Sequence, residues 1–201
     1  MTRRDHGILV ASVLGVLGLV LPLTVLVRDK WSPLQDLDAD SSTGLTLAPG
    51  LARDVVLGLT QLGAPLVLEA AALVIAVVLL RASRRKMAVY VLVTVFGAEL
   101  MSTLLKHVVS RVRPCVDAAS CPATTSFPSG HATGAAAFWT VAAVLLLPRL
   151  GRRAWWLLAV PAGVAVTRVL LGVHYPSDVL AGLIVGGCWA AACTVLLREA
   201  A

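Results

Sequence analysis

Apolar runs of membrane-spanning length are the feature that most limits how this chain can fold. The runs cover residues 7–27, 64–80, 87–105, 131–147, 155–173 and 179–197. An apolar helix of about 20 residues is long enough to cross the hydrocarbon core of a bilayer. Hydrophobic residues make up 58% of the chain and charged residues only 14%, a balance that excludes an ordinary soluble domain. We therefore expect an all-α integral membrane protein, with residues 1–201 forming one bundle of six transmembrane helices.

The first run, residues 7–27, is compatible with a cleaved signal sequence or with a membrane helix. It follows Arg3 and Arg4, exceeds the roughly 7–15 residues of a signal core, and is not followed by a small-x-small cleavage site. We interpret it as the first transmembrane helix. Residues 28–50 are then predicted to form a polar loop, and residues 51–62 a short helix at the membrane interface.

The distribution of positive charge predicts the orientation of this bundle. With six crossings, ten of the 17 lysine and arginine residues lie on the side of the two termini. They are Arg3, Arg4, Arg81, Arg84, Arg85, Lys86, Arg149, Arg152, Arg153 and Arg198. Because cytoplasmic loops carry an excess of such residues, we expect cytoplasmic termini and an opposite end that faces the periplasm or exterior. The net charge of +6 alone would suggest nucleic acid, but short basic clusters between apolar runs fit membrane topology better.

The polar stretch of residues 106–130 carries the first candidate site residues. Lys106 and Arg113 lie where the third predicted helix leaves the bilayer, and Pro114 follows Arg113. Each cation by itself is compatible with a snorkelling anchor. Together they suit an anion, since arginine presents a planar fork to phosphate oxygens and lysine a compact charge.

The segment Pro128-Ser129-Gly130-His131 predicts the start of the fourth helix. Ser129 is a candidate N-cap, and Gly130 lets a ligand approach the backbone closely. Unpaired N–H groups at a helix N-terminus favour anions. His131, in the first turn, is placed to act as a general acid. The alternative is an ordinary capped helix with a histidine at the interface.

The third group of candidates, Arg168, His174 and Asp178, lies around the connection between the fifth and sixth helices. An aspartate that accepts from one ring nitrogen of histidine fixes the tautomer and leaves the other nitrogen available for attack on phosphorus. An unpaired cation such as Arg168 is costly in an apolar helix, so an anionic partner is expected. The alternative is a capping aspartate beside an interfacial histidine.

In chain order the three groups read K-x6-R-P, P-S-G-H and R-x5-H-x3-D. This pattern closely resembles the signature of the type 2 phosphatidic acid phosphatase superfamily, with Thr167 where the family usually has serine. The resemblance implies a phosphatase that needs no metal and no cofactor. In it His174 attacks phosphorus to form a phosphohistidine, Asp178 orients His174, and His131 protonates the leaving group. The resemblance also assigns the phosphoryl oxygens to Lys106, Arg113, Ser129, Gly130 and Arg168.

The predicted location of the site, at the outer membrane-water interface, suits a lipid phosphate whose tail stays in the bilayer. By resemblance the expected substrates are undecaprenyl diphosphate, phosphatidic acid or phosphatidylglycerol phosphate. Two other classes stay open. A non-catalytic lipid-phosphate binding or transport protein would not need both histidines and the aspartate. A vanadium haloperoxidase shares the anion-site pattern by family relation, but such enzymes are typically soluble.

The remaining polar residues are interpreted individually. Cys115 and Cys121 lie in the predicted outer loop, where we expect a disulfide in an oxidising compartment, with two free thiols as the alternative. Glu99 lies two turns before Lys106. We interpret it either as an ion-pair partner of Lys106 or Arg168, or as a residue that lines the lipid entrance. Arg111 is interpreted as an interfacial residue. No carboxylate or Cys/His cluster has metal-ligand spacing.

Overall fold

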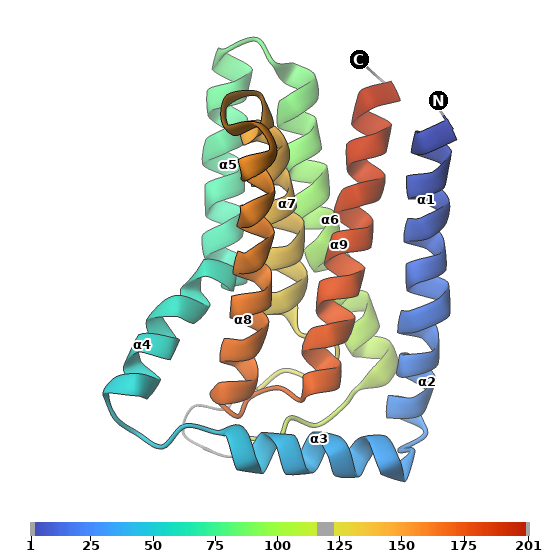
Figure 1. Ribbon diagram of the computed structural model, residues 1–201, viewed down its shortest axis with the longest axis vertical. Coiled ribbons are helices and arrows are strands. Elements are labelled where there is room, and N and C mark those ends of the chain that lie inside the picture. The colour runs from blue at the N-terminus through green and yellow to red at the C-terminus, as the bar shows by residue number, and fades with distance from the viewer. Residues whose placement is uncertain (1–2, 116–122, 200–201) are drawn as a thin grey trace.

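The computed structural model describes residues 3–115 and 123–199, and all regular structure in these residues is helical (Figure 1). The long helices lie side by side in a bundle, and one short helix crosses its end. In chain order, with η marking short segments of 3-10 or π helix, the elements are α1 (Arg3–Gly15), η1 (Val16–Val20), α2 (Leu21–Arg28), α3 (Ser32–Leu45), α4 (Leu51–Leu59), η2 (Thr60–Gly63), α5 (Pro65–Arg81), α6 (Arg85–Val109), α7 (Gly130–Leu150), η4 (Gly151–Leu158), α8 (Ala159–Leu170) and α9 (Pro176–Glu199).

Several of these segments are long and apolar enough to cross a membrane. Four pass by length and composition: Asp5–Arg28, Arg85–Val109, Gly130–Leu170 and Pro176–Leu197. A fifth is the pair Leu51–Gly63 and Pro65–Arg81, which is bent by 42°. Large apolar side chains such as Leu66 and Val74 of α5 point outward, 78% and 64% exposed, as a surface in contact with lipid requires. The prediction of a helical multi-pass membrane protein is confirmed, and the count of six crossings stays a prediction.

Helices α7 and α9 pack closely because small residues line their interface. A side-chain carbon on Gly182 would lie 2.7 Å from the carbonyl oxygen of Ser129 and 3.0 Å from Oγ1 of Thr133. Gly186 meets the backbone of Thr133 in the same way. Small residues let two helix backbones approach each other. As a result the start of α7 lies beside the start of α9, and the Ser129 N–H donates to the carbonyl of Asp178 over 3.0 Å.

The ends of two predicted helices differ from the sequence-based expectation. The third was predicted over residues 87–105, but α6 continues four residues further, so Lys106 belongs to its last turn. Ser110 then ends the helix in a left-handed conformation with φ of 49°, and its N–H donates to the Lys106 carbonyl. The predicted fifth helix is divided between η4 and α8, and α8 ends at Leu170. Apolar content marks the part inside the bilayer and does not mark where backbone hydrogen bonding stops.

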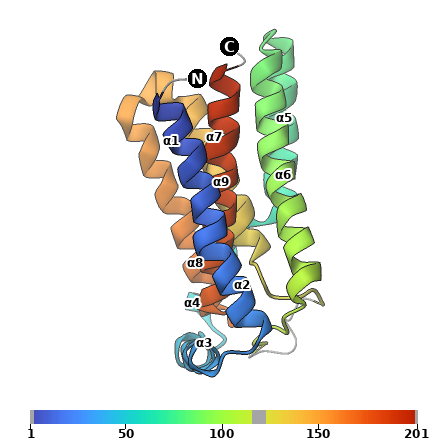
Figure 2. The ribbon, with the colours of Figure 1, turned by 90° about the vertical axis from the view of Figure 1, so that its right-hand side faces the viewer.

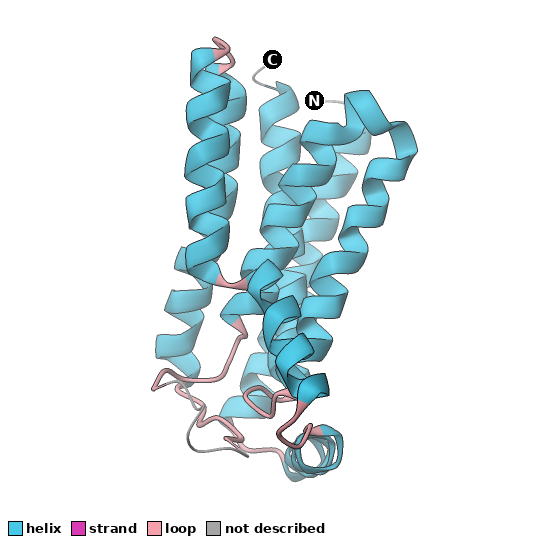
Figure 3. Cartoon of the chain, turned by 90° about the vertical axis from the view of Figure 1, so that its left-hand side faces the viewer, coloured by secondary structure: helices cyan, strands magenta, loops and turns pink. Residues whose placement is uncertain are grey.

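Helix α3 occupies part of the stretch predicted as a polar loop, residues 28–50. Its few apolar residues show no clear period, and tertiary contacts hold it in place, as is common for short helices. Leu34 packs against a cluster that contains Val27 and Phe127, and Asp38 is 1% exposed. The helix lies across the long helices and is seen end-on in the two side views (Figures 2 and 3).

The two ends of the described chain lie at one end of the bundle, and α3 lies at the other (Figure 1). The segments that carry the candidate site residues all reach the α3 end: the end of α6, the start of α7, the end of α8 and the start of α9. The short helix predicted over residues 51–62 is present as α4 and η2. The fold therefore brings the three sequence motifs to the end of the bundle that α3 crosses.

Candidate active site

His174 and Asp178 form the buried centre of this end of the bundle. Their side chains are 1% and 0% exposed, and Nδ1 of His174 lies 3.4 Å from Oδ2 of Asp178. The same Oδ2 accepts the N–H of Tyr175 over 3.0 Å, which anchors the carboxylate to the turn before α9. The predicted contact between the two residues is therefore present, with Nδ1 as the ring nitrogen that faces the carboxylate.

Arg113 contacts the other ring nitrogen of His174. Its Nη1 lies 2.8 Å from Nε2 of His174 and 2.9 Å from the carbonyl oxygen of Val173. Its Nε and Nη2 donate to the carbonyl and hydroxyl of Thr124 over 2.7 and 2.9 Å. A guanidinium group can only donate, so Nε2 must be the accepting nitrogen. This assigns the ring proton to Nδ1, toward Asp178, and leaves a lone pair on Nε2.

Burial keeps the imidazole of His174 neutral. Removal from water lowers the pKa of His174 from its ordinary 6.5 to about 4, although the hydrogen bond and charge of Asp178 act in the opposite direction. The positive charges of Arg113 and Arg168 lower it further. At neutral pH the ring is therefore uncharged, which is the state that a nucleophile needs.

Two buried donors near this pair have no hydrogen-bond partner among the described residues. They are Oγ of Ser129, in a side chain with no exposure, and Nε of Arg168, in a residue that is 7% exposed. Ser129 is the N-cap residue of α7, as predicted, but its hydroxyl does not cap the helix. Arg168 is held through Nη1, which lies 3.2 Å from Oγ1 of Thr60. Buried polar atoms usually have partners, so these two donors call for an acceptor.

Lys106, in the last turn of α6, lies beside the start of α7. The Nζ of Lys106 donates to Oγ of Ser102 over 3.1 Å. A side-chain carbon on Gly130 would lie 3.0 Å from Nζ and 3.8 Å from Oε1 of Glu99. Any larger residue at position 130 would therefore displace the lysine. The glycine lets an ammonium group and a helix N-terminus lie together, which is a favourable setting for an anion.

His131 lies in the first turn of α7 and is half-buried. The charged or titratable groups that act on it include Arg168, His174, Arg113 and Lys106, so it shares their surroundings. Its carbonyl oxygen lies 3.0 Å from where a side-chain carbon on Gly63 would be. The segment η2 thus packs directly against the turn that carries His131.

Arg111 is the residue that sequence reasoning placed wrongly. It was interpreted as interfacial, but its side chain is buried, with Nη1 2.8 Å from Oδ1 of Asp178 and Nη2 2.8 Å from Oδ2 of Asp38. One signal for this was present: Arg111 stands two residues before Arg113, a spacing that points side chains the same way in extended chain. Asp38 gave no comparable signal, because it is one of several aspartates in a polar stretch.

Two further expectations involve cysteines and metals. Cys121 lies outside the described residues, so the Cys115–Cys121 disulfide stays a prediction, although Cys115 does have an interaction partner. Cys188 and Cys193 are free thiols within α9. Over residues 3–115 and 123–199 there is no group of three or more His, Cys, Asp or Glu side chains that could hold a metal ion.

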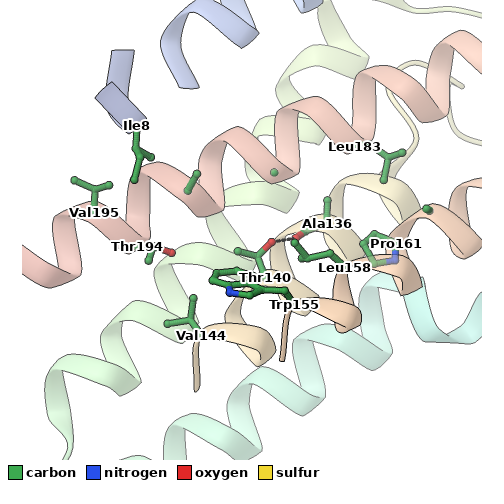
Figure 4. Close-up of a pocket in the computed structure, with 13 residues that line it drawn as sticks. Ile8, Ala136, Thr140, Val144, Trp155, Leu158, Pro161, Leu183, Thr194 and Val195 are labelled. Carbon is green, nitrogen blue, oxygen red and sulfur yellow. Dashed lines mark hydrogen bonds between the residues drawn. The ribbon is translucent and has the colours of Figure 1, made fainter. Parts of the chain in front are cut away.

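Two pockets of several hundred Å³ are lined by residues other than His174 and Asp178. The pocket in Figure 4, about 450 Å³, lies between α1, α7, η4, α8 and α9, with Trp155 and Thr140 facing it. None of the predicted site residues lines this pocket. A second groove, of about 500 Å³, is lined almost entirely by apolar side chains of α1, η1, α2, α6 and α9 and reaches Leu104 and Leu105, next to Lys106. The lining of this second groove includes a direct sequence neighbour of a candidate site residue, and the lining of the first pocket does not.

The fold and the site define a multi-pass helical membrane protein in which a buried histidine–aspartate pair lies among arginine and lysine side chains. The chain belongs to the PAP2 superfamily, whose family model matches residues 87–200. This confirms the family that the three motifs predicted. The matched region contains all of the predicted site residues, and it leaves out α1 to α5.

Curated relatives carry phosphatase names. A lipid A 1-phosphatase of Rhizobium etli is 41% identical over 108 residues, which are 49% of this chain and 45% of that protein. A decaprenylphosphoryl-5-phosphoribose phosphatase of Mycobacterium tuberculosis is 41% identical over 95 residues, 45% of this chain and 50% of that protein. Phosphatidylglycerophosphatase B of Bacillus subtilis is 37% identical over 100 residues, 46% and 49% of the two chains. The matches span about half the length of these relatives.

A solved structure supports the fold over nearly the whole chain. It is the crystal structure of a transmembrane PAP2-type phosphatidylglycerolphosphate phosphatase from Bacillus subtilis. The TM-score is 0.74, the sequence identity 24%, and the likeness covers 92% of this chain and 97% of the other. At this identity the likeness shows the shared fold alone.

Proposed function

We propose that this protein is a lipid phosphatase that hydrolyses a phosphate or diphosphate monoester of a membrane lipid through a phosphohistidine. The observation that carries the proposal is the pair of contacts on His174. Asp178 faces Nδ1 and Arg113 faces Nε2, so a neutral imidazole is held with its lone pair toward a cation. A phosphoryl group drawn to that cation would meet the nucleophilic nitrogen. The phosphatase names of the curated relatives agree with this chemistry.

In the first step Nε2 of His174 attacks phosphorus while the bond from phosphorus to the leaving oxygen breaks. His131 gives its proton to that oxygen, and the product is a phosphohistidine and an alcohol or a lipid monophosphate. In the second step water attacks phosphorus, the P–N bond breaks, and the proton of the water returns to His131. Inorganic phosphate leaves and both histidines regain their starting states.

The cations and the start of α7 stabilise the charge that spreads over the phosphoryl oxygens. Phosphoryl transfer depends mainly on positioning and on such charge stabilisation. Ser129 Oγ and Arg168 Nε are buried donors available to these oxygens. Arg113 turns its Nη1 from Nε2 to a phosphoryl oxygen when the substrate binds, which exposes the lone pair at the moment of attack. Lys106 and the Gly130 amide complete the set.

The substrate class is a lipid whose tail lies beside α6. We place the tail in the apolar groove, whose lining includes Leu104 and Leu105, the two residues directly before Lys106 in the chain. The candidate substrates are undecaprenyl diphosphate, phosphatidic acid and phosphatidylglycerol phosphate. The names of the relatives add lipid A and decaprenylphosphoryl-5-phosphoribose as compounds to test.

The proposed topology has six crossings, with α7 and α8 as separate antiparallel spans and α5 with α4 as one bent span. Both termini lie in the cytoplasm, and the α3 end faces the periplasm or exterior at headgroup level. Support comes from the position of the termini at one end of the bundle and from the excess of lysine and arginine predicted there (Figure 1).

The test is release of phosphate from this panel of lipids by detergent-purified protein in the presence of EDTA. His174→Ala should abolish release, and His107→Ala, at an exposed histidine on the last turn of α6, should leave it unchanged. Equal release by His174→Ala and wild type would refute the nucleophile assignment. Lipid binding without release would favour a binding or transport protein, and halide oxidation with added vanadate would favour a haloperoxidase.

A further inference from the structure

Arg111 joins two buried carboxylates that are far apart in the sequence. Its Nη2 lies 2.8 Å from Oδ2 of Asp38 in α3, and its Nη1 lies 2.8 Å from Oδ1 of Asp178. The side chains of Arg111, Asp38 and Asp178 are 8%, 1% and 0% exposed. The guanidinium also stacks over the ring of Tyr175, 4.0 Å from its centre. Burial of a charged group costs so much free energy that the group must be paired. The two ion pairs of Arg111 fix the positions of Asp38 and Asp178 relative to each other.

Asp38 makes a second set of contacts with the same turn. Its Oδ1 accepts the N–H of Ser177 over 3.1 Å, and its Oδ2 accepts the Ser177 hydroxyl. The Ser177 oxygen in turn accepts from Nη1 of Arg111 over 2.8 Å. Ser177 directly precedes Asp178 in the chain. Asp38, Arg111 and Ser177 therefore form a closed set of hydrogen bonds around the residue that faces His174.

The two oxygens of Asp178 are divided between this set and His174. Oδ1 is bound by Arg111, while Oδ2 faces Nδ1 of His174 and the N–H of Tyr175. Because Arg111 fixes Oδ1, rotation of the carboxylate away from the imidazole would break a buried ion pair. Arg111 acts on His174 through Asp178, so its loss should slow turnover more than it weakens substrate binding.

We propose that Asp38 and Arg111 are positioning residues for the His174–Asp178 pair, and that α3 must be seated on the site through Asp38 for full turnover. The inference rests on the phosphatase function proposed above. Helix α3 thereby becomes part of the working site, although none of its residues is in the region that matches the family model.

The main test variant is Asp38→Asn, which keeps the shape of the side chain and an acceptor for the Ser177 N–H but removes the charge. We expect kcat to fall roughly tenfold with KM changed less than about twofold. The matched control is Asp36→Asn, the same change at an exposed position of the same helix, and it should leave both constants unchanged. Asp38→Glu, which restores the charge, should recover part of the lost kcat.

A double-mutant cycle with Arg111→Gln separates positioning from a general structural role. If Asp38 acts through Arg111, adding Asp38→Asn to Arg111→Gln should lower kcat no further. Independent effects that multiply in the double variant would overturn the proposal. So would a value of kcat for Asp38→Asn that equals that of Asp36→Asn.

Hydrogen exchange gives a readout that does not depend on activity. In Asp38→Asn the amides of α3 should exchange at least about tenfold faster than in Asp36→Asn, because the helix has lost its buried ion pair. Unchanged exchange would overturn the seating of α3, whatever the enzyme assays show. If phosphate release fails to depend on His174 while α3 exchange responds as expected, the proposed function fails and the link between α3 and Asp178 stands.

Discussion

The Nη1 of Arg113 lies 2.8 Å from Nε2 of His174, on the opposite side of the ring from the nitrogen that faces Asp178. Arg111, two residues earlier, contacts Asp178 itself. One short segment after α6 therefore supplies one arginine to the imidazole and another to the carboxylate. The two arginines have different contacts: Arg113 faces the ring nitrogen that we propose as the nucleophile, and Arg111 holds the carboxylate on the other side of the ring.

Arg113→Lys should lower kcat/KM by roughly a hundredfold, because lysine cannot reproduce the fork that contacts Nε2 and Thr124 together. Steady-state phosphate release measures this loss. The control is Arg28→Lys, the same change at an exposed residue at the end of α2, which should leave kcat/KM unchanged. An Arg113→Lys enzyme with wild-type kinetics would mean that the fork is not needed.

Ser129→Ala should lower activity without lowering stability. The Oγ of Ser129 is buried and lacks a partner among the described residues, so its removal relieves an unsatisfied group and raises the free energy of unfolding by about 1 kcal/mol. Phosphate release should fall roughly tenfold, since one donor to the phosphoryl oxygens is lost. Thermal unfolding and kinetics on the same samples check both parts, with the exposed Ser32→Ala as control. Loss of stability together with loss of activity would indicate a structural hydroxyl.

Ala192→Phe should block the groove proposed for the lipid tail. Ala192 lines the apolar groove beside α6, whereas its neighbour Ala191 lines the other pocket. We expect Ala192→Phe to raise KM several-fold for long-chain lipid phosphates and to leave hydrolysis of a short water-soluble phosphate ester unchanged. Ala191→Phe is the matched control. If the two variants discriminate equally against long chains, the groove is not the tail site.

Acid should destabilise the fold through His174. Its pKa is about 4 in the folded protein, below the ordinary 6.5, because the ring is buried. Between these values the unfolded chain binds a proton that the folded protein does not, so stability is lost as pH falls from 6.5 to 4. The loss from this group reaches about 3 kcal/mol. Chemical unfolding in detergent across this range should show a loss of stability that is about 3 kcal/mol larger in wild type than in His174→Gln. Parallel curves for the two proteins would contradict it.

The sequence indicated the PAP2 motifs because their residue types are dictated by the chemistry, and the family they indicated is confirmed. Lys106, Ser129 and Arg168 were chosen as candidates from charge and helix-start signals, and the helix order alone required them to share one end of the bundle. The helix ends that carry them lie at one end of the bundle (Figure 1), and Gly130 packs against the ammonium group of Lys106. Their roles in catalysis stay predictions until they are measured.

The residues that support the site could not be predicted in the same way. Asp38 reaches Arg111 only because α3 folds across the end of the bundle, and a polar helix held by tertiary contacts has no periodic signal in the sequence. Thr60 reaches Arg168 from η2, more than a hundred residues away in the chain. Pairings between distant segments are set by the packing of the whole bundle, which local patterns do not specify.

The measurement that tests the central claim most directly is trapping of the covalent intermediate. Purified protein is mixed with a lipid substrate labelled with radioactive phosphorus in the terminal phosphoryl group, quenched during turnover in EDTA, and digested to locate the label. The account predicts a label that survives alkali, is released by acid, lies on the peptide that contains His174 and is absent from His174→Ala. Rapid turnover by wild type with no label on protein, or a label that persists in His174→Ala, would contradict it.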